Sequence, residues 1–158
     1  CTTMNFNATI KSVPEYLVLS VRDIIPNYAS EGLLWERICQ LEASKFAKVG
    51  GACFAIYYDE GYKEANVDVE VVVEVDQPFE NGKDYTCRKT EAVKTMVSVL
   101  VPGDFSHIAE GFAFAGEWIE QNGYQIAGES RQATLRGPWN ESDPANYLTE
   151  VQIPVKKD

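Results

Sequence analysis

The run YLTEVQIPV at residues 147–155 alternates strictly between two kinds of side chain. Val151, Ile153 and Val155 fall on one side of an extended backbone, and Glu150 falls on the other. A period of two is typical of a strand with one buried face. We therefore predict a closing strand whose branched aliphatic side chains enter the core, while the Glu150 carboxylate lies on the opposite face.

The run VDVEVVVEV at residues 67–75 has the same spacing, which indicates that the chain is built twice. Glu70 aligns with Glu150, and Val71 aligns with Val151. We predict an α+β fold in which duplicated strand-helix-strand-strand units form a curved antiparallel sheet. Two main helices are expected on one face of this sheet and a ligand groove on the other.

The remaining patterns complete both copies. One helix is expected over residues 30–46, where Leu34, Ile38 and Leu41 form an apolar stripe, and a second over residues 106–121. Residues 8–22 are expected to form one strand kinked at Pro14 or two short strands. Further strands are expected over 52–58, over 86–101, and over 124–135 with a break near Gly128. These elements predict a single domain at 5–158 with pseudo-symmetric halves at about 5–76 and 85–156.

Composition narrows the classes of function. The formal net charge of -10 at pH 7 argues against a nucleic-acid interface on this segment, because phosphates are bound by basic surfaces. The same charge makes the chain a poor partner for anionic membranes. The cysteines form no C-x-x-C motif and His107 is the one histidine, so we predict neither a metal site nor a cofactor. Reduced cysteines predict a cytoplasmic protein.

Several short motifs, in order along the chain, resemble those of a known family. The ending Thr149–Val155 matches the TE-x-x-x-PV ending of the GyrI-like (gyrase-inhibitor-like) small-molecule-binding domains. These are the effector-binding domains of many MerR- and AraC-type transcription regulators. The resemblance extends over about Thr9 to Val155, and it is strongest to clostridial-type MerR regulators. The other matching segments are Ile25-Pro26, EGLLWE at 31–36, DEGY at 59–62, DVE at 68–70, Trp118-Ile119 and Asn122-Gly123-Tyr124.

The resemblance implies a duplicated α+β fold with a central pocket. In such domains a buried glutamate among aromatic rings binds lipophilic cations, and the matching motif gives Glu150 that role. The chain begins at Cys1 rather than at Met, so we expect either a fragment of a longer protein or a chain that carries added residues. The resemblance implies that it is the small-molecule-binding part of a MerR-type regulator. A domain upstream would then contact DNA, and the full-length protein could be a homodimer. An alternative stays open, because stand-alone relatives hydrolyse cyclopropane-bearing toxins in the same pocket or sequester them.

The residues expected to contact the ligand combine carboxylates with aromatic rings. A carboxylate in an apolar groove is unfavourable to ionise unless a cation accompanies it, and aromatic faces attract that cation further. Glu70 is either a second acid in the groove or only the symmetric surface residue. The expected ligand contacts are Glu150, Glu70, Trp35, Tyr57, Trp139 and Tyr147.

The sequence offers no conventional catalytic set. No Ser-His-Asp combination, phosphate loop or metal cluster can be assembled from its motifs. We therefore predict a binding domain rather than an enzyme, with no catalytic residue. The enzymatic alternative would use Glu150 with a tyrosine as general base and general acid on a strained electrophile.

Overall fold

The computed structural model describes residues 6–59, 65–136 and 141–157. Its chain divides into two compact units, which are described separately below. Unit 2 is Pro14–Ala92, and unit 1 combines Cys1–Val13 with Val93–Asp158. Each unit contains antiparallel strands and one main helix, which confirms the predicted α+β class.

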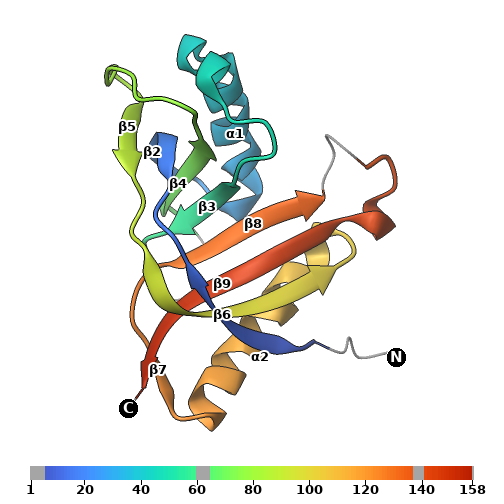
Figure 1. Ribbon diagram of the computed structural model, residues 1–158. Coiled ribbons are helices and arrows are strands. Elements are labelled where there is room, and N and C mark those ends of the chain that lie inside the picture. The colour runs from blue at the N-terminus through green and yellow to red at the C-terminus, as the bar shows by residue number, and fades with distance from the viewer. Residues whose placement is uncertain (1–5, 60–64, 137–140, 158) are drawn as a thin grey trace. The chain divides into compact units, whose positions relative to one another are not determined.

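Unit 2 has an antiparallel sheet in the order β3-β4-β2-β5. Its strands are β2 (Leu17–Ile25), β3 (Cys53–Tyr57), β4 (Val67–Glu74) and β5 (Thr86–Lys89). Helix α1 (Glu31–Gln40) lies along β2 and β4, as Figure 1 shows, with short 3-10 helices at Tyr28–Ser30 and Glu42–Phe46 on either side of it.

Unit 1 repeats this arrangement in the order β8-β9-β6-β1, which corresponds strand by strand to β3-β4-β2-β5 of unit 2. The additional strand β7 pairs with β9. Its strands are β1 (Ala8–Val13), β6 (Val93–Pro102), β7 (Tyr124–Ile126), β8 (Ser130–Arg136) and β9 (Leu148–Lys157). Helix α2 (Ile108–Gln121) packs on β6 and β9, after a 3-10 turn at Phe105–His107, and another such turn at Pro144–Asn146 precedes β9.

The two cores have the composition that the alternating strands predict. In unit 2, Val69 and Val71 pack with Leu34 and Ile38 of α1. In unit 1, the equivalent cluster holds Val151, Ile153 and Val155 with Ala115 and Ile119 of α2. Burial of these branched side chains against a helix is the main favourable contribution to folding in each unit. Glu70 and Glu150 therefore lie on the sheet faces opposite the helices.

The first strand of each sequence repeat joins the sheet of the other repeat. β1 pairs with β6 rather than with β2, and β5, which precedes β6 in the chain, pairs with β2. For this reason the compact units do not follow the expected halves at about 5–76 and 85–156. The chain crosses between units after Val13 and again after Ala92. Alternation in the sequence indicates that a strand forms, but it does not specify which neighbour the strand pairs with.

Two details differ from the predicted elements. The extended region at 86–101 is two strands, β5 and β6, rather than one. Helix α1 ends at Gln40, since Leu41 has extended backbone angles, and a 3-10 turn continues to Phe46. Residues 8–22 form two strands that share no partner, which is one of the two alternatives expected there. They are separated near Pro14, where the ring removes a backbone donor.

Two further features bear on the class of protein. Within the described residues, neither main helix is long and apolar enough to cross a membrane. Cys39, Cys53 and Cys87 are free thiols.

Candidate ligand-binding site

Glu70 lies at the centre of a polar network in unit 2. Ser20 and Tyr58 each donate a hydroxyl hydrogen bond to its carboxylate. Arg88 binds both oxygens, with Nε 2.8 Å from Oε2 and Nη2 2.5 Å from Oε1. The Glu70 side chain is only 4% exposed. A two-point guanidinium–carboxylate contact is the strongest form of ion pair in proteins, so Glu70 already has a complete set of partners.

The pKa values in this network follow from its contacts. Burial alone would raise the pKa of Glu70, but hydrogen bonds from Arg88, Ser20 and Tyr58 and the charge of Arg88 lower it below its usual value. Burial and the adjacent Glu70 carboxylate raise the pKa of Tyr58. Glu70 is therefore ionised and Tyr58 is a neutral hydrogen-bond donor at neutral pH.

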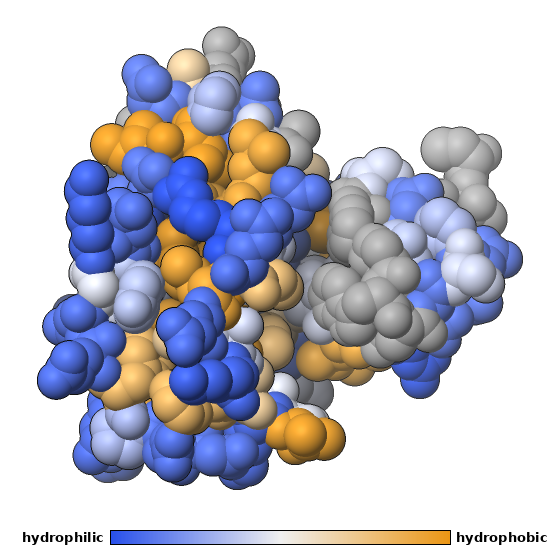
Figure 2. Space-filling view, turned by 90° about the horizontal axis from the view of Figure 1, so that it is seen from above, coloured by the Kyte–Doolittle hydropathy of each residue, from blue (hydrophilic) through white to orange (hydrophobic). Residues whose placement is uncertain are grey.

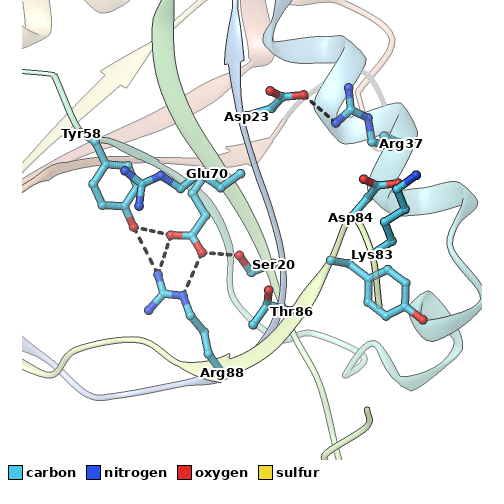
Figure 3. Close-up of a pocket in the computed structure, with 11 residues that line it drawn as sticks. Ser20, Asp23, Arg37, Tyr58, Glu70, Lys83, Asp84, Thr86 and Arg88 are labelled. Atoms are coloured by element: carbon cyan, nitrogen blue, oxygen red, sulfur yellow. Dashed lines mark hydrogen bonds and ion pairs between the residues drawn. The ribbon is translucent and has the colours of Figure 1, made fainter. Parts of the chain in front are cut away.

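A cavity of about 560 Å³ opens beside this network (Figure 3). Its lining is dominated by paired charges. Arg37 contacts Asp23, and the guanidinium carbon of Arg22, which also contacts Asp68, lies 3.6 Å from the centroid of the Tyr58 ring. The lining residues are Ser20, Arg22, Asp23, Arg37, Tyr58, Glu70, Lys83, Asp84, Tyr85, Thr86 and Arg88. A wall of this kind suits polar groups rather than a lipophilic body.

Glu150 has a simpler environment in unit 1. Ser98 donates a hydrogen bond to Oε2 at 2.5 Å, and Nζ of Lys11 lies 2.5 Å from the same oxygen. Burial would raise the pKa of Glu150, but Lys11, Ser98 and Gln152 lower it below its usual value. The Glu150 side chain is 8% exposed, whereas that of Lys11 is 43% exposed. The lysine thus reaches from the surface of the unit to a buried carboxylate.

The strand registers show that these two acids occupy equivalent positions. Arg22 stands opposite Glu70, and Leu100 stands opposite Glu150. Ser20 and Ser98 each precede that opposite residue by two positions. On the exchanged edge strands, Arg88 pairs with Val18, which precedes Ser20 by two positions. Lys11 pairs with Met96, which precedes Ser98 by two positions. Arg88 and Lys11 are therefore equivalent cations in the two units.

The duplicated site has diverged in polarity. Where unit 2 has Arg22 opposite its glutamate, unit 1 has Leu100, which is 48% exposed. Tyr58 stands two residues after the partner of Glu70 on β3. Leu135, which is 45% exposed, stands two residues after the partner of Glu150 on β8, at the point where the β8–β9 register shifts. Figure 2 shows hydrophobic residues reaching the surface among strongly hydrophilic ones. Single exposed apolar side chains are common, but Leu100 stands directly opposite a buried carboxylate.

Trp35 and Tyr57 meet at a third carboxylate, on the other face of the sheet in unit 2. Trp35 Nε1 donates to Oε2 of Glu31 at 3.0 Å, and the Tyr57 hydroxyl donates to Oε1 at 2.5 Å. Tyr28 packs edge-on against Tyr57, with 5.8 Å between ring centroids. Both predicted residues also contact the core beneath α1. The structure therefore brings Trp35 and Tyr57 together with Glu31 and not with Glu70.

Of the two remaining predicted contacts, the structure describes Tyr147. Tyr147 is partly buried directly before β9, and its carbonyl accepts a hydrogen bond from Gly103. Trp139 lies outside the described residues.

Sequence reasoning missed the residues that bond to the two strand glutamates. Ser20 and Ser98 could have been found by extending the repeat alignment to the preceding strand. Lys11 and Arg88 could not, because their contacts depend on the strand exchange between the repeats.

Comparison with known proteins agrees with this duplicated architecture. The family described as the GyrI-like small molecule binding domain matches residues 6–156. The chain belongs to this family. No curated protein sequence matches the chain at a significant level.

The solved structures include a neighbour that matches almost the whole chain. The crystal structure of the EcmrR C-terminal domain is 32% identical, with a TM-score of 0.91, and the match covers 98% of this chain and 100% of that domain. EcmrR has also been solved in a complex with DNA, at 32% identity and a TM-score of 0.90. There the match covers 97% of this chain but 58% of the EcmrR chain. The predicted effector-domain fold is thus confirmed.

More distant structures share the fold alone. A hydrolase from Listeria innocua is 15% identical with a TM-score of 0.65, and the match covers 94% of this chain and 91% of that chain. SAV2435, solved bound to tetraphenylphosphonium, is 13% identical with a TM-score of 0.68, and the match covers 95% of this chain and 94% of that chain. The GyrI-like fold therefore occurs both in a ligand-bound protein and in one described as a hydrolase.

Proposed function

We propose that this chain is the effector-binding domain of a MerR-type transcription regulator and that its ligand is a lipophilic cation. The observation that carries the proposal is the match of the whole chain to the C-terminal domain of EcmrR. In the full-length regulator a separate domain would contact DNA. The regulator would act in the cytoplasm as a homodimer. The ligand would act by binding one conformation of the regulator better than another.

The charge of the ligand follows from the carboxylates. The chain is strongly acidic, with a formal net charge of -10, and it buries the side chains of Glu70 and Glu150 on its strands. A buried carboxylate selects a cation, and a lipophilic cation supplies both the charge and an apolar body. The binding of tetraphenylphosphonium by SAV2435, which has the same fold, supports this class of ligand.

The proposed ligand contacts are Glu150, Trp139 and Tyr147, three of the residues predicted from the sequence. Glu70 is left out because Arg88 binds both of its oxygens. Trp35 and Tyr57 are left out because they bond to Glu31 on the other face of the sheet. Among the two strand carboxylates, a cation at Glu70 would have to replace the two-point contact of Arg88, whereas a cation at Glu150 would replace the single contact of Lys11. Glu150 is therefore the favoured carboxylate. Aromatic rings would add contacts to the apolar body of the ligand.

Calorimetric titration with tetraphenylphosphonium tests the function. The matched neutral compound is triphenylphosphine oxide, which has similar aryl groups without a net charge. We expect saturable binding of the cation and at least about tenfold weaker binding of the neutral compound, a difference of about 1.4 kcal/mol. Equal affinity for both compounds would contradict the proposed cationic ligand.

A hydrolase is the second candidate, because the Listeria innocua protein of this fold is described as one. Glu150 would then act as a general base on a strained electrophile such as a cyclopropane. Incubation of a cyclopropane-bearing compound with substoichiometric protein separates the two functions. A binding domain yields no turnover, and multiple turnovers would establish the enzyme.

A further inference from the structure

We propose that Lys11 is a displaceable internal counterion, whose ammonium group occupies the place at Glu150 that the positive charge of the ligand takes. This inference rests on the proposed function and adds a residue that sets affinity and charge selectivity. It also assigns different roles to the two equivalent glutamates. Glu150 receives the ligand, and Glu70 forms a permanent structural ion pair.

The two glutamates differ in the type of contact that they make with their cations. Lys11 approaches one carboxylate oxygen with one nitrogen, whereas Arg88 contacts both oxygens of Glu70 through two nitrogens. A lysine ammonium is a compact charge on a flexible stem, and a guanidinium is a planar group that matches a carboxylate. The Lys11 contact can therefore be exchanged for another cation with less loss of geometry.

The two side chains of the Lys11–Glu150 pair differ in their exposure to solvent. The Lys11 side chain is 43% exposed while the Glu150 side chain beneath it is 8% exposed. Rotation of the lysine stem towards solvent would uncover the carboxylate without any change in the core. Among the residues that the structure describes, Lys11 is the cationic side chain in an ion pair with Glu150.

The two glutamates also differ in the polarity of their surroundings. Leu100 stands opposite Glu150 where Arg22 stands opposite Glu70. A ligand cation at Glu70 would thus meet a second positive side chain, whereas at Glu150 it would meet an exposed leucine. An apolar neighbour favours a lipophilic cation over a well-hydrated ammonium ion, because burial of apolar surface adds to the charge attraction.

The test is a comparison of affinities for tetraphenylphosphonium and triphenylphosphine oxide in Lys11→Met. Methionine keeps an unbranched apolar side chain and removes the competing charge. We expect the variant to bind the cation about tenfold more tightly than the wild type and the neutral compound within about twofold of it. The gain must depend on the ligand charge, because simple widening of the site would improve both affinities.

The equivalent ion pair supplies a matched control. Arg88→Met combined with Glu70→Gln removes the charges of the other pair together, so no buried charge is left alone. This double variant should bind both compounds within about twofold of the wild type. Should Lys11→Met prove too unstable, Lys11→Gln provides the same loss of charge with a polar side chain.

The outcomes separate this inference from the function on which it rests. If the wild type does not bind tetraphenylphosphonium, the proposed ligand class is wrong. If the wild type binds it, but Lys11→Met and Lys11→Gln leave the affinity unchanged, only the role of Lys11 is overturned. An affinity gain in the Arg88→Met/Glu70→Gln variant would also overturn it, because that result would place the cation at Glu70.

Discussion

Nζ of Lys11 lies 2.5 Å from Oε2 of Glu150, and the two residues come from opposite ends of the chain. Their contact exists because β1 pairs with β6 instead of with the strand that follows it. The same exchange brings Arg88 of β5 to Glu70. Strand exchange therefore gives each unit an edge strand that carries the counterion of its buried glutamate.

The two ion pairs should differ in their contribution to stability. Arg88→Met leaves Glu70 buried without its counterion, so we expect a loss of about 3 kcal/mol. Lys11→Met removes a partly exposed contact, and we expect a loss of about 1 kcal/mol. Denaturant unfolding of both variants measures this difference. Equal losses would show that Lys11 is held as firmly as Arg88.

Acid should destabilise the chain partly through these glutamates. The pKa values of Glu70 and Glu150 are both lowered in the folded chain, so the unfolded state binds protons more readily. Their stabilisation is complete above the unfolded value of about 4.3 and disappears as the pH falls through the lower folded values. Unfolding free energies of wild type and Glu70→Gln/Glu150→Gln should therefore converge between about pH 5 and pH 3. A constant difference over this range would contradict the account.

Deletion of residues 1–13 tests the strand exchange. This change removes β1 and leaves the β6 edge unpaired, although β1 lies next to β2 in the sequence. Hydrogen exchange should therefore accelerate in β6 amides that face β1, while β2 amides keep their protection, because β2 pairs with β4 and β5. Faster exchange confined to β2 would indicate that β1 belongs to the first repeat.

The contact between Trp35 and Glu31 should contribute to the packing of α1. Trp35→Phe keeps an aromatic ring and removes the indole donor, which lies 3.0 Å from Oε2 of Glu31. We expect a loss of about 1 kcal/mol in unfolding free energy, typical of one hydrogen bond. Glu31→Gln should then lower the free energy of unfolding less in the Trp35→Phe variant than in the wild type. Additive losses would show that the two side chains do not interact.

The repeated alternation in the sequence predicted most of the fold. The spacing of Val71 and Val151 correctly places the helices on one face of each sheet and the glutamates on the other. Both helices form where their apolar stripes predict them, although α1 ends at Gln40 rather than near residue 46.

The neighbours of each glutamate were less predictable. Pairing between strands is a long-range property, so neither Lys11 nor Arg88 could be assigned to a carboxylate from local patterns. Tyr57 and Tyr58, at the end of β3, also show that local patterns do not predict the partner of a side chain. Tyr57 bonds to Glu31, and its neighbour Tyr58 bonds to Glu70.

The affinity of Glu150→Gln for tetraphenylphosphonium, measured beside that of Glu70→Gln, tests the central claim most directly. Glutamine keeps the size of each side chain and removes its charge. We predict that Glu150→Gln binds the cation at least about tenfold more weakly than the wild type, while Glu70→Gln stays within about twofold. Equal affinities in all three proteins, or a loss confined to Glu70→Gln, would contradict the account.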